Sequence, residues 1–204
     1  MGSRNIKPAA IALIDEKLKY DQMARLAIAN QSDQRQLYIR AVSSFLGTLE
    51  VGNNGGYEVE LFLATVGLHA GDAWCMSFQQ TCLAYVETKL SIASPIYASG
   101  SVINVWKNSQ AQRVVNIPKP GAIAIFQHVD DPVHGHTGMV VDYDADKRIF
   151  HTIEGNQAEG LRTETGGLRY LGQQGVRFVE RVVDFDGKQQ GTSDLVLRGF
   201  LKPF

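Results

Sequence analysis

Cysteine is scarce in this chain of 204 residues, in which Cys75 and Cys82 are the only two. They lie seven positions apart in a segment with the pattern of one helix, so about 10 Å of helical rise separates them. A disulfide needs Cα atoms within about 7 Å of each other. We therefore expect two free thiols, and the chain does not have the cysteine framework of a disulfide-stapled domain.

Long apolar runs and an excess of charge of one sign are also missing. The net charge of -1 gives no reason to expect nucleic acid or an anionic membrane as a partner. No apolar run reaches about 18 residues, so no transmembrane helix is expected. The short apolar stretch from Pro8 to Ile14 is followed at once by Asp15 and Glu16, without a small-residue cleavage site. This pattern favours an amphipathic helix over a signal peptide.

The spacing of apolar residues changes from helical to strand-like along the chain. Helices are predicted over residues 8–50, with a polar break around 28–36, and over 57–66, 72–90 and 101–108. β-rich runs separated by turns are predicted over residues 122–126, 137–143, 149–153, 176–185 and 195–201. Helices followed by an antiparallel sheet are typical of an α+β domain.

Cys75 opens the clearest predicted helix, for which Asp72 is the expected N-cap. Unpaired N–H groups and the helix dipole stabilise negative charge at such a position, and the thiolate is the nucleophilic form of cysteine. Cys82 lies in mid-helix on the apolar face, which is typical of a buried structural cysteine. Cys75 is therefore the candidate nucleophile.

His136 is the candidate base among the five histidines, because it begins a predicted strand. A hairpin through Asp144 would pair this strand with the next one, which carries Glu154 and Asn156. Strand alternation places these two side chains on one face, where either could accept the N–H of His136. By contrast, His134 and the other histidine of the preceding loop are expected to be exposed.

Five segments, in this order, resemble the CHAP domain, the cysteine, histidine-dependent amidohydrolase/peptidase group of the NlpC/P60-like, papain-like superfamily. The resemblance covers roughly residues 41–204, so we interpret residues 1–40 as an N-terminal helical extension and 41–204 as a CHAP-like catalytic domain. The five segments are Gly71-Asp-Ala-Trp-Cys-Met-Ser-Phe78, Pro118-Lys-Pro-Gly-Ala-Ile-Ala-Ile-Phe126, Gly135-His-Thr-Gly-Met-Val140, Thr152-Ile-Glu-Gly-Asn156 and Arg198-Gly-Phe-Leu-Lys-Pro203.

The resemblance implies a papain-like α+β fold with Cys75 as nucleophile, His136 as base, and Glu154 and Asn156 as orienting or polar partners. Trp74, beside the nucleophile, is the candidate substrate-binding residue. Members of the family cut amide bonds in peptidoglycan, either between sugar and stem peptide or within the peptides, and some cleave glutathionylspermidine. Neither a metal nor another cofactor is expected. Two departures from the family pattern are Met76, where a small residue is usual, and a long loop over 127–135.

Other interpretations stay open. His134 and His136, with Asp130 or Asp131, could hold zinc, although no strong zinc-binding spacing is present. The acidic residues from 142 to 146 resemble the start of a calcium loop, but they fit a hairpin turn better. The chain could also be a non-catalytic wall-binding module on a papain-like fold, or an amidase that acts on a soluble conjugate.

A peptidoglycan hydrolase must reach the periplasm or the cell wall, and this chain has no clear signal peptide. Three routes fit this pattern: a phage lysin, an antibacterial effector injected by a secretion machine, or a chain whose leader has been removed. We expect a monomer that acts on peptidoglycan and binds neither nucleic acid nor a membrane. An injected effector would also need an immunity protein, which could cover the cleft at Cys75.

Overall fold

The computed structural model describes residues 4–114, 117–162, 168–187, 189 and 194–204, and it has an α+β architecture, as predicted. The helices are α1 Pro8–Leu18, α2 Gln22–Ala29, α3 Gln34–Ser43, α4 Tyr57–Thr65, α5 Cys75–Leu90 and α6 Val102–Asn108, and η1 Gln110–Gln112 is a short 3-10 turn. The strands are β1 Arg113–Val114, β2 Ile123–His128, β3 Gly135–Asp144, β4 Ile149–Arg162, β5 Leu168–Val182 and β6 Leu195–Leu201.

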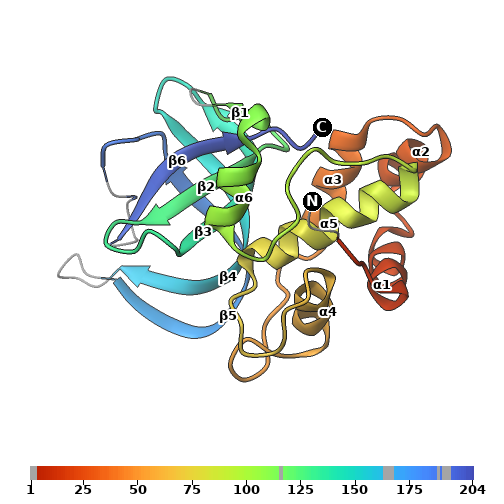
Figure 1. Ribbon diagram of the computed structural model, residues 1–204, viewed down its shortest axis with the longest axis horizontal. Coiled ribbons are helices and arrows are strands. Elements are labelled where there is room, and N and C mark those ends of the chain that lie inside the picture. The colour runs from red at the N-terminus through yellow and green to blue at the C-terminus, as the bar shows by residue number, and fades with distance from the viewer. Residues whose placement is uncertain (1–3, 115–116, 163–167, 188, 190–193) are drawn as a thin grey trace.

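The strands form one antiparallel sheet in the order β1-β6-β2-β3-β4-β5. Figure 1 shows the sheet on one side of the molecule and helices α1, α2 and α3 on the other, with α5 running between them. α5 packs against α3 and α4 and also against β3 and β4. Within the described residues, no helix combines the length and the apolar character that a membrane span requires.

α5 is the central helix of the core, and nearly all of its side chains are buried, including polar ones. The buried amide of Gln79 accepts a hydrogen bond from the Tyr38 hydroxyl of α3 at 2.5 Å and donates one to the Ile153 carbonyl of β4 at 3.3 Å. Ile14 of α1 and Leu37 of α3 belong to the same apolar cluster as α5. The N-terminal helices therefore share one core with the helix that carries Cys75.

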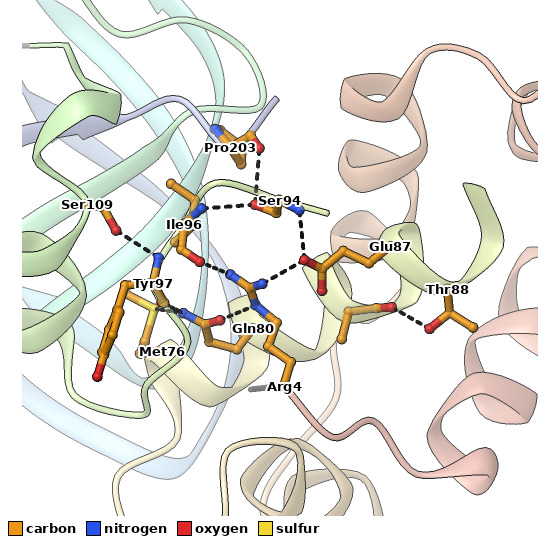
Figure 2. Close-up of polar contacts among 11 residues, drawn as sticks. Arg4, Met76, Gln80, Glu87, Thr88, Ser94, Ile96, Tyr97, Ser109 and Pro203 are labelled. Carbon is orange, nitrogen blue, oxygen red and sulfur yellow. Dashed lines mark hydrogen bonds and ion pairs between the residues drawn. The ribbon is translucent and has the colours of Figure 1, made fainter. Parts of the chain in front are cut away.

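Arg4 ties the segment before α1 to α5, as Figure 2 shows. Its guanidinium bonds Gln80 at 2.5 Å and Glu87 at 2.7 Å, both on α5, and a further N–H reaches the Ile96 carbonyl. Only 6% of the Arg4 side chain is exposed. A division of the chain near residue 41 remains a proposal, and these contacts together with the shared core favour a segment 1–40 that folds with the rest.

We expect Arg4→Met to lower the free energy of unfolding by about 2–3 kcal/mol, because Glu87 would lose its cation while staying largely buried. The matched control is Lys19→Met, which removes an exposed ion pair with Glu16 and should cost less than about 1 kcal/mol. Urea unfolding followed by circular dichroism measures both losses. A loss for Arg4→Met no larger than the control's would favour a separable N-terminal segment.

The start of α5 differs from the prediction. Asp72 does not cap the helix, because its carboxylate closes a turn on the His69 N–H at 3.0 Å. The N-cap is Trp74, which makes no capping side-chain bond, and the helix begins at Cys75 itself. The nucleophile candidate therefore occupies the first helical position.

Two other predicted boundaries were wrong. The helix expected to run to residue 49 ends at Ser43, because the chain turns to pair with β5: the Gly47 N–H donates to the Val176 carbonyl at 3.1 Å. β4 and β5 extend well beyond the predicted runs 149–153 and 176–185, as far as Arg162 and back to Leu168. Hydrogen bonds between the two strands extend the sheet over residues whose polar composition does not predict a strand.

Candidate active site

Cys75 lies at the bottom of a cavity of about 830 Å³, where the first turn of α5 meets β3 and β4. Its thiol is free and only 5% exposed. The N–H groups of a first helical turn have no partner within the helix, so they favour negative charge at this sulfur. The cavity is lined by Ala73, Cys75, His128, Asp130, Asp131, His134, Gly135, His136, Asn156, Gln157, Ala158, Gln174, Asp194 and Leu195.

Trp74 supports the helix start from inside the protein. Its indole is 0% exposed, donates to Glu50 at 3.3 Å and packs against the Phe62 ring. Gly155 lies against it so closely that a Cβ on Gly155 would be 2.7 Å from the indole. This placement contradicts the expectation that Trp74 contacts substrate, because the side chain faces the core and does not line the cavity.

His136 is the second residue of β3, and it lines the same cavity as Cys75, whose thiol is near enough to raise the pKa of the imidazole. Its Nε2 lies 2.7 Å from a carboxylate oxygen of Glu154, which leaves Nδ1 as the ring nitrogen for Cys75. A glycine must precede the histidine, because a Cβ on Gly135 would be 2.3 Å from the Phe126 carbonyl oxygen. The structure thus brings Cys75, His136 and Glu154 together in the nucleophile–base–orienter order.

Burial alone would lower the pKa of His136, but the Glu154 carboxylate and the hydrogen bonds to Cys75 and Glu154 outweigh it and raise the pKa to about 9. The ring therefore carries a proton at neutral pH. Since an unperturbed imidazole titrates near 6.5, this charged pair stabilises the fold fully below that pH. The contribution is lost as the pH rises through about 9.

Glu154 is fully buried, and three side chains satisfy its carboxylate. Besides His136, the Thr152 hydroxyl donates to it at 2.6 Å, and the guanidinium of Arg181 bonds both oxygens at 2.8 and 2.5 Å. Burial would raise the pKa of Glu154, but the positive charges of Arg181 and His136 hold it well below its usual range. Arg181 was not predicted as a site residue, and its one signal is a charge within the β-rich run 176–185.

Asn156 lies beside the site without serving as the partner of the imidazole. Its backbone is left-handed, with φ 57, and the β4–β5 register is interrupted between Glu154 and Gln157. Strict alternation therefore fails here, because Glu154 reaches His136 whereas Asn156 lines the cavity. The Oδ1 of Asn156 is buried and has no hydrogen-bond partner.

The loop between β2 and β3 and the start of β6 form an acidic wall of the same cavity. His134 pairs with Asp131 and His128 with Asp194, each at 2.5 Å. His134 and His136 are thus engaged with different carboxylates, although the zinc interpretation needed both for one ion. Among the residues that the structure describes, no group of three or more His, Cys, Asp or Glu side chains is arranged to hold a metal ion.

The acidic stretch that resembles a calcium loop forms a hairpin turn. Asp144 accepts the backbone N–H groups of Asp146 and Lys147 at 3.1 and 3.2 Å. Asp142 is paired with His151 at 2.6 Å. These side chains therefore connect β3 to β4 and fix the hairpin that places Glu154 beside His136.

Residues 68–156 match the family model of the CHAP domain. No curated protein and no solved structure matches the chain. The matched segment contains Cys75, His136, Glu154 and Asn156. The matched segment is thus similar to the CHAP domain, a cysteine/histidine-dependent amidohydrolase/peptidase domain of the papain-like class.

Proposed function

We propose that this protein hydrolyses an amide bond of bacterial peptidoglycan, with Cys75 as nucleophile and His136 as general base and acid. The observation that carries the proposal is that Cys75 and His136 line one open cavity and that the imidazole of His136 lies 2.7 Å from the buried Glu154 carboxylate. A papain-like, NlpC/P60-type architecture is part of the same proposal. The helix that presents the cysteine packs against the strands that present the histidine and its carboxylate, which supports it.

The reaction would proceed through a thioester. The sulfur of Cys75 attacks the amide carbonyl carbon as a thiolate, beside the proton that His136 carries at neutral pH. The C–N bond breaks when His136 gives that proton to the leaving nitrogen, and water, deprotonated by the same ring, then hydrolyses the thioester. Glu154 fixes the ring and stabilises the imidazolium, and the N–H groups of the first turn of α5 stabilise the oxyanion. The free Oδ1 of Asn156 is suited to accept an N–H of the substrate.

Digestion of purified sacculi tests this function. Wild-type protein should release soluble fragments, and mass spectrometry of their new amine and carboxyl ends identifies the bond that is cut. A free lactyl group on the sugar would mean an amidase, whereas new ends within the peptides would mean an endopeptidase. No release by folded wild-type protein would contradict the peptidoglycan proposal. Equal binding of sacculi by wild type and Cys75→Ala, without release by either, would favour a non-catalytic wall-binding module.

The acidic wall favours a second candidate, an amidase that acts on a soluble polyamine conjugate such as glutathionylspermidine. Asp130, Asp131 and Asp194 line the cavity, and its described lining includes neither lysine nor arginine. Carboxylates on one side of a cleft attract cationic groups and repel anionic ones. A substrate with a free amine near the scissile bond fits this wall, whether it belongs to a wall peptide or to a polyamine.

We expect Asp130→Asn together with Asp131→Asn to raise KM severalfold for an amide substrate that carries a free amine, with little change in kcat. The reason is that the wall attracts the amine without touching the reacting atoms. Steady-state kinetics on glutathionylspermidine and on soluble wall peptides measures the effect, and the N-acetylated substrate is the matched control. If the variant has the KM of the wild type for the free-amine substrate, the acidic wall does not attract the substrate amine.

Reaching the wall requires delivery, and we propose an antibacterial effector or a phage lysin that acts in the periplasm or cell wall. The test is expression in a Gram-negative host with and without an added export leader. Lysis that requires the leader and is lost in Cys75→Ala supports a wall substrate. Equal toxicity from the cytoplasm would point to a soluble substrate instead. An immunity protein that covers the Cys75 cavity would be detected by rescue of the exported form.

A further inference from the structure

We propose that Arg181 is a positioning residue for the Cys75–His136 reaction, because its guanidinium holds Glu154 as a carboxylate in the orientation that bonds His136. The inference rests on the proposed cysteine mechanism and goes beyond the residues of the family match, which ends at residue 156. Arg181 lies on β5, opposite Phe150 of β4 in the sheet register.

The contact between Arg181 and Glu154 is bidentate and buried. Nε donates to one carboxylate oxygen at 2.8 Å and an Nη group to the other at 2.5 Å. The exposed fraction is 2% for Arg181 and 0% for Glu154. Two parallel bonds fix the plane of a carboxylate as well as its position, which a single-point cation does not.

The surroundings of Arg181 hold the guanidinium itself in place. Its carbon lies 4.9 Å from the centre of the Phe126 ring, and the same ring lies 6.5 Å from the imidazole of His136, tilted by 30°. Phe126 is fully buried on β2. The guanidinium, the carboxylate and the imidazole are thus packed around one aromatic ring, so the orientation of Arg181 is passed to His136 through Glu154.

The charges explain why a cation is needed at this position. An unpaired carboxylate in the interior takes up a proton or finds a partner, because burial disfavours its charge. Glu154 serves His136 only as a carboxylate, since a protonated acid does not stabilise an imidazolium in the same way. Arg181 supplies a permanent positive charge next to Glu154, so His136 does not have to balance the buried carboxylate alone.

The test measures how fast iodoacetamide alkylates Cys75 as a function of pH, in a Cys82→Ala background that leaves one thiol. In Arg181→Met, Glu154 should protonate at higher pH, so the acid limb of the rate profile should move up by about one pH unit or more. Arg181→Lys keeps the charge without the bidentate fork and should restore part of the shift. On a hydrolysable substrate, kcat should fall while KM stays within about twofold.

The matched control is Arg148→Met. Arg148 directly precedes β4, and its partly buried guanidinium donates to the Val183 carbonyl. Its acid limb should coincide with that of the parent protein. An unchanged profile in folded Arg181→Met would overturn the inference, and so would an Arg181→Lys profile equal to the parent's if Arg181→Met does not fold. Alkylation needs no substrate. A failure to digest sacculi would therefore contradict the proposed function, whereas the alkylation profile would still test the role of Arg181.

Discussion

Cys75→Ala should abolish fragment release from sacculi, with a loss of at least about 10⁴-fold, while the protein stays folded. The thiol supplies the attacking electron pair, and neither water nor a neighbouring side chain replaces it in a site built around thioester formation. The side chain is small and lines the cavity, so its shortening to alanine should leave the packing of α5 largely intact. Turnover is measured on sacculi, and folding by the urea midpoint.

Cys82→Ala is the control for this substitution. Cys82 lies in the middle of the same helix, is 0% exposed, and has a pKa that burial raises well above its ordinary value. Its thiol therefore stays protonated and out of reach of substrate, so its loss should cost stability without changing the chemistry. Substantial hydrolysis by folded Cys75→Ala would end the cysteine mechanism.

His136→Ala should be as damaging as the loss of Cys75, and the double variant should be no worse than either single one. The two residues act as a unit, so removing one leaves the other without a function in the reaction. The reaction needs one group that holds a proton beside the thiolate and gives it to the leaving nitrogen, and His136 is the ring that lines the cavity with Cys75. Single-turnover rates on a soluble wall peptide measure all three losses.

The control histidine is His134, two positions earlier on the same loop and strand. Its side chain is 73% exposed and bonded to Asp131, so His134→Ala should keep most of the activity. An inactive His134→Ala beside an active His136→Ala would mean that the wrong histidine was chosen. That outcome would also revive the zinc interpretation, in which both rings are ligands.

The sequence predicted Cys75 and His136 together with either Glu154 or Asn156, because two short-range features determine this arrangement. The start of a helix fixes the position of Cys75. The hairpin closed by Asp144 sets the pairing of β3 with β4, in which Met139 lies opposite Ile153. The helix-then-sheet order likewise followed from periodicity. Local patterns that each depend on a few neighbouring residues were thus sufficient for the α+β class and for placing Cys75 and His136, whereas the choice of Glu154 over Asn156 came from the structure.

The features that were missed depend on contacts between distant segments. Arg181 reaches Glu154 only because β5 pairs with β4 in a register that the irregularities after Glu154 shift. Alternation could not anticipate the left-handed backbone of Asn156, which sends the side chain into the cavity. Trp74 was placed on the wrong side because its direction depends on how α5 packs against Phe62 and Gly155.

Titration of Cys75 with iodoacetamide, followed in parallel with sacculus digestion, tests the central claim most directly. Peptide mass spectrometry locates the label, and EDTA is added to a second sample. We expect hydrolysis to fall in proportion to the alkylation of Cys75, with Cys82 unlabelled in the folded protein and EDTA without effect. Hydrolysis that survives complete labelling of Cys75, or that EDTA abolishes while Cys75 stays free, would contradict the cysteine mechanism.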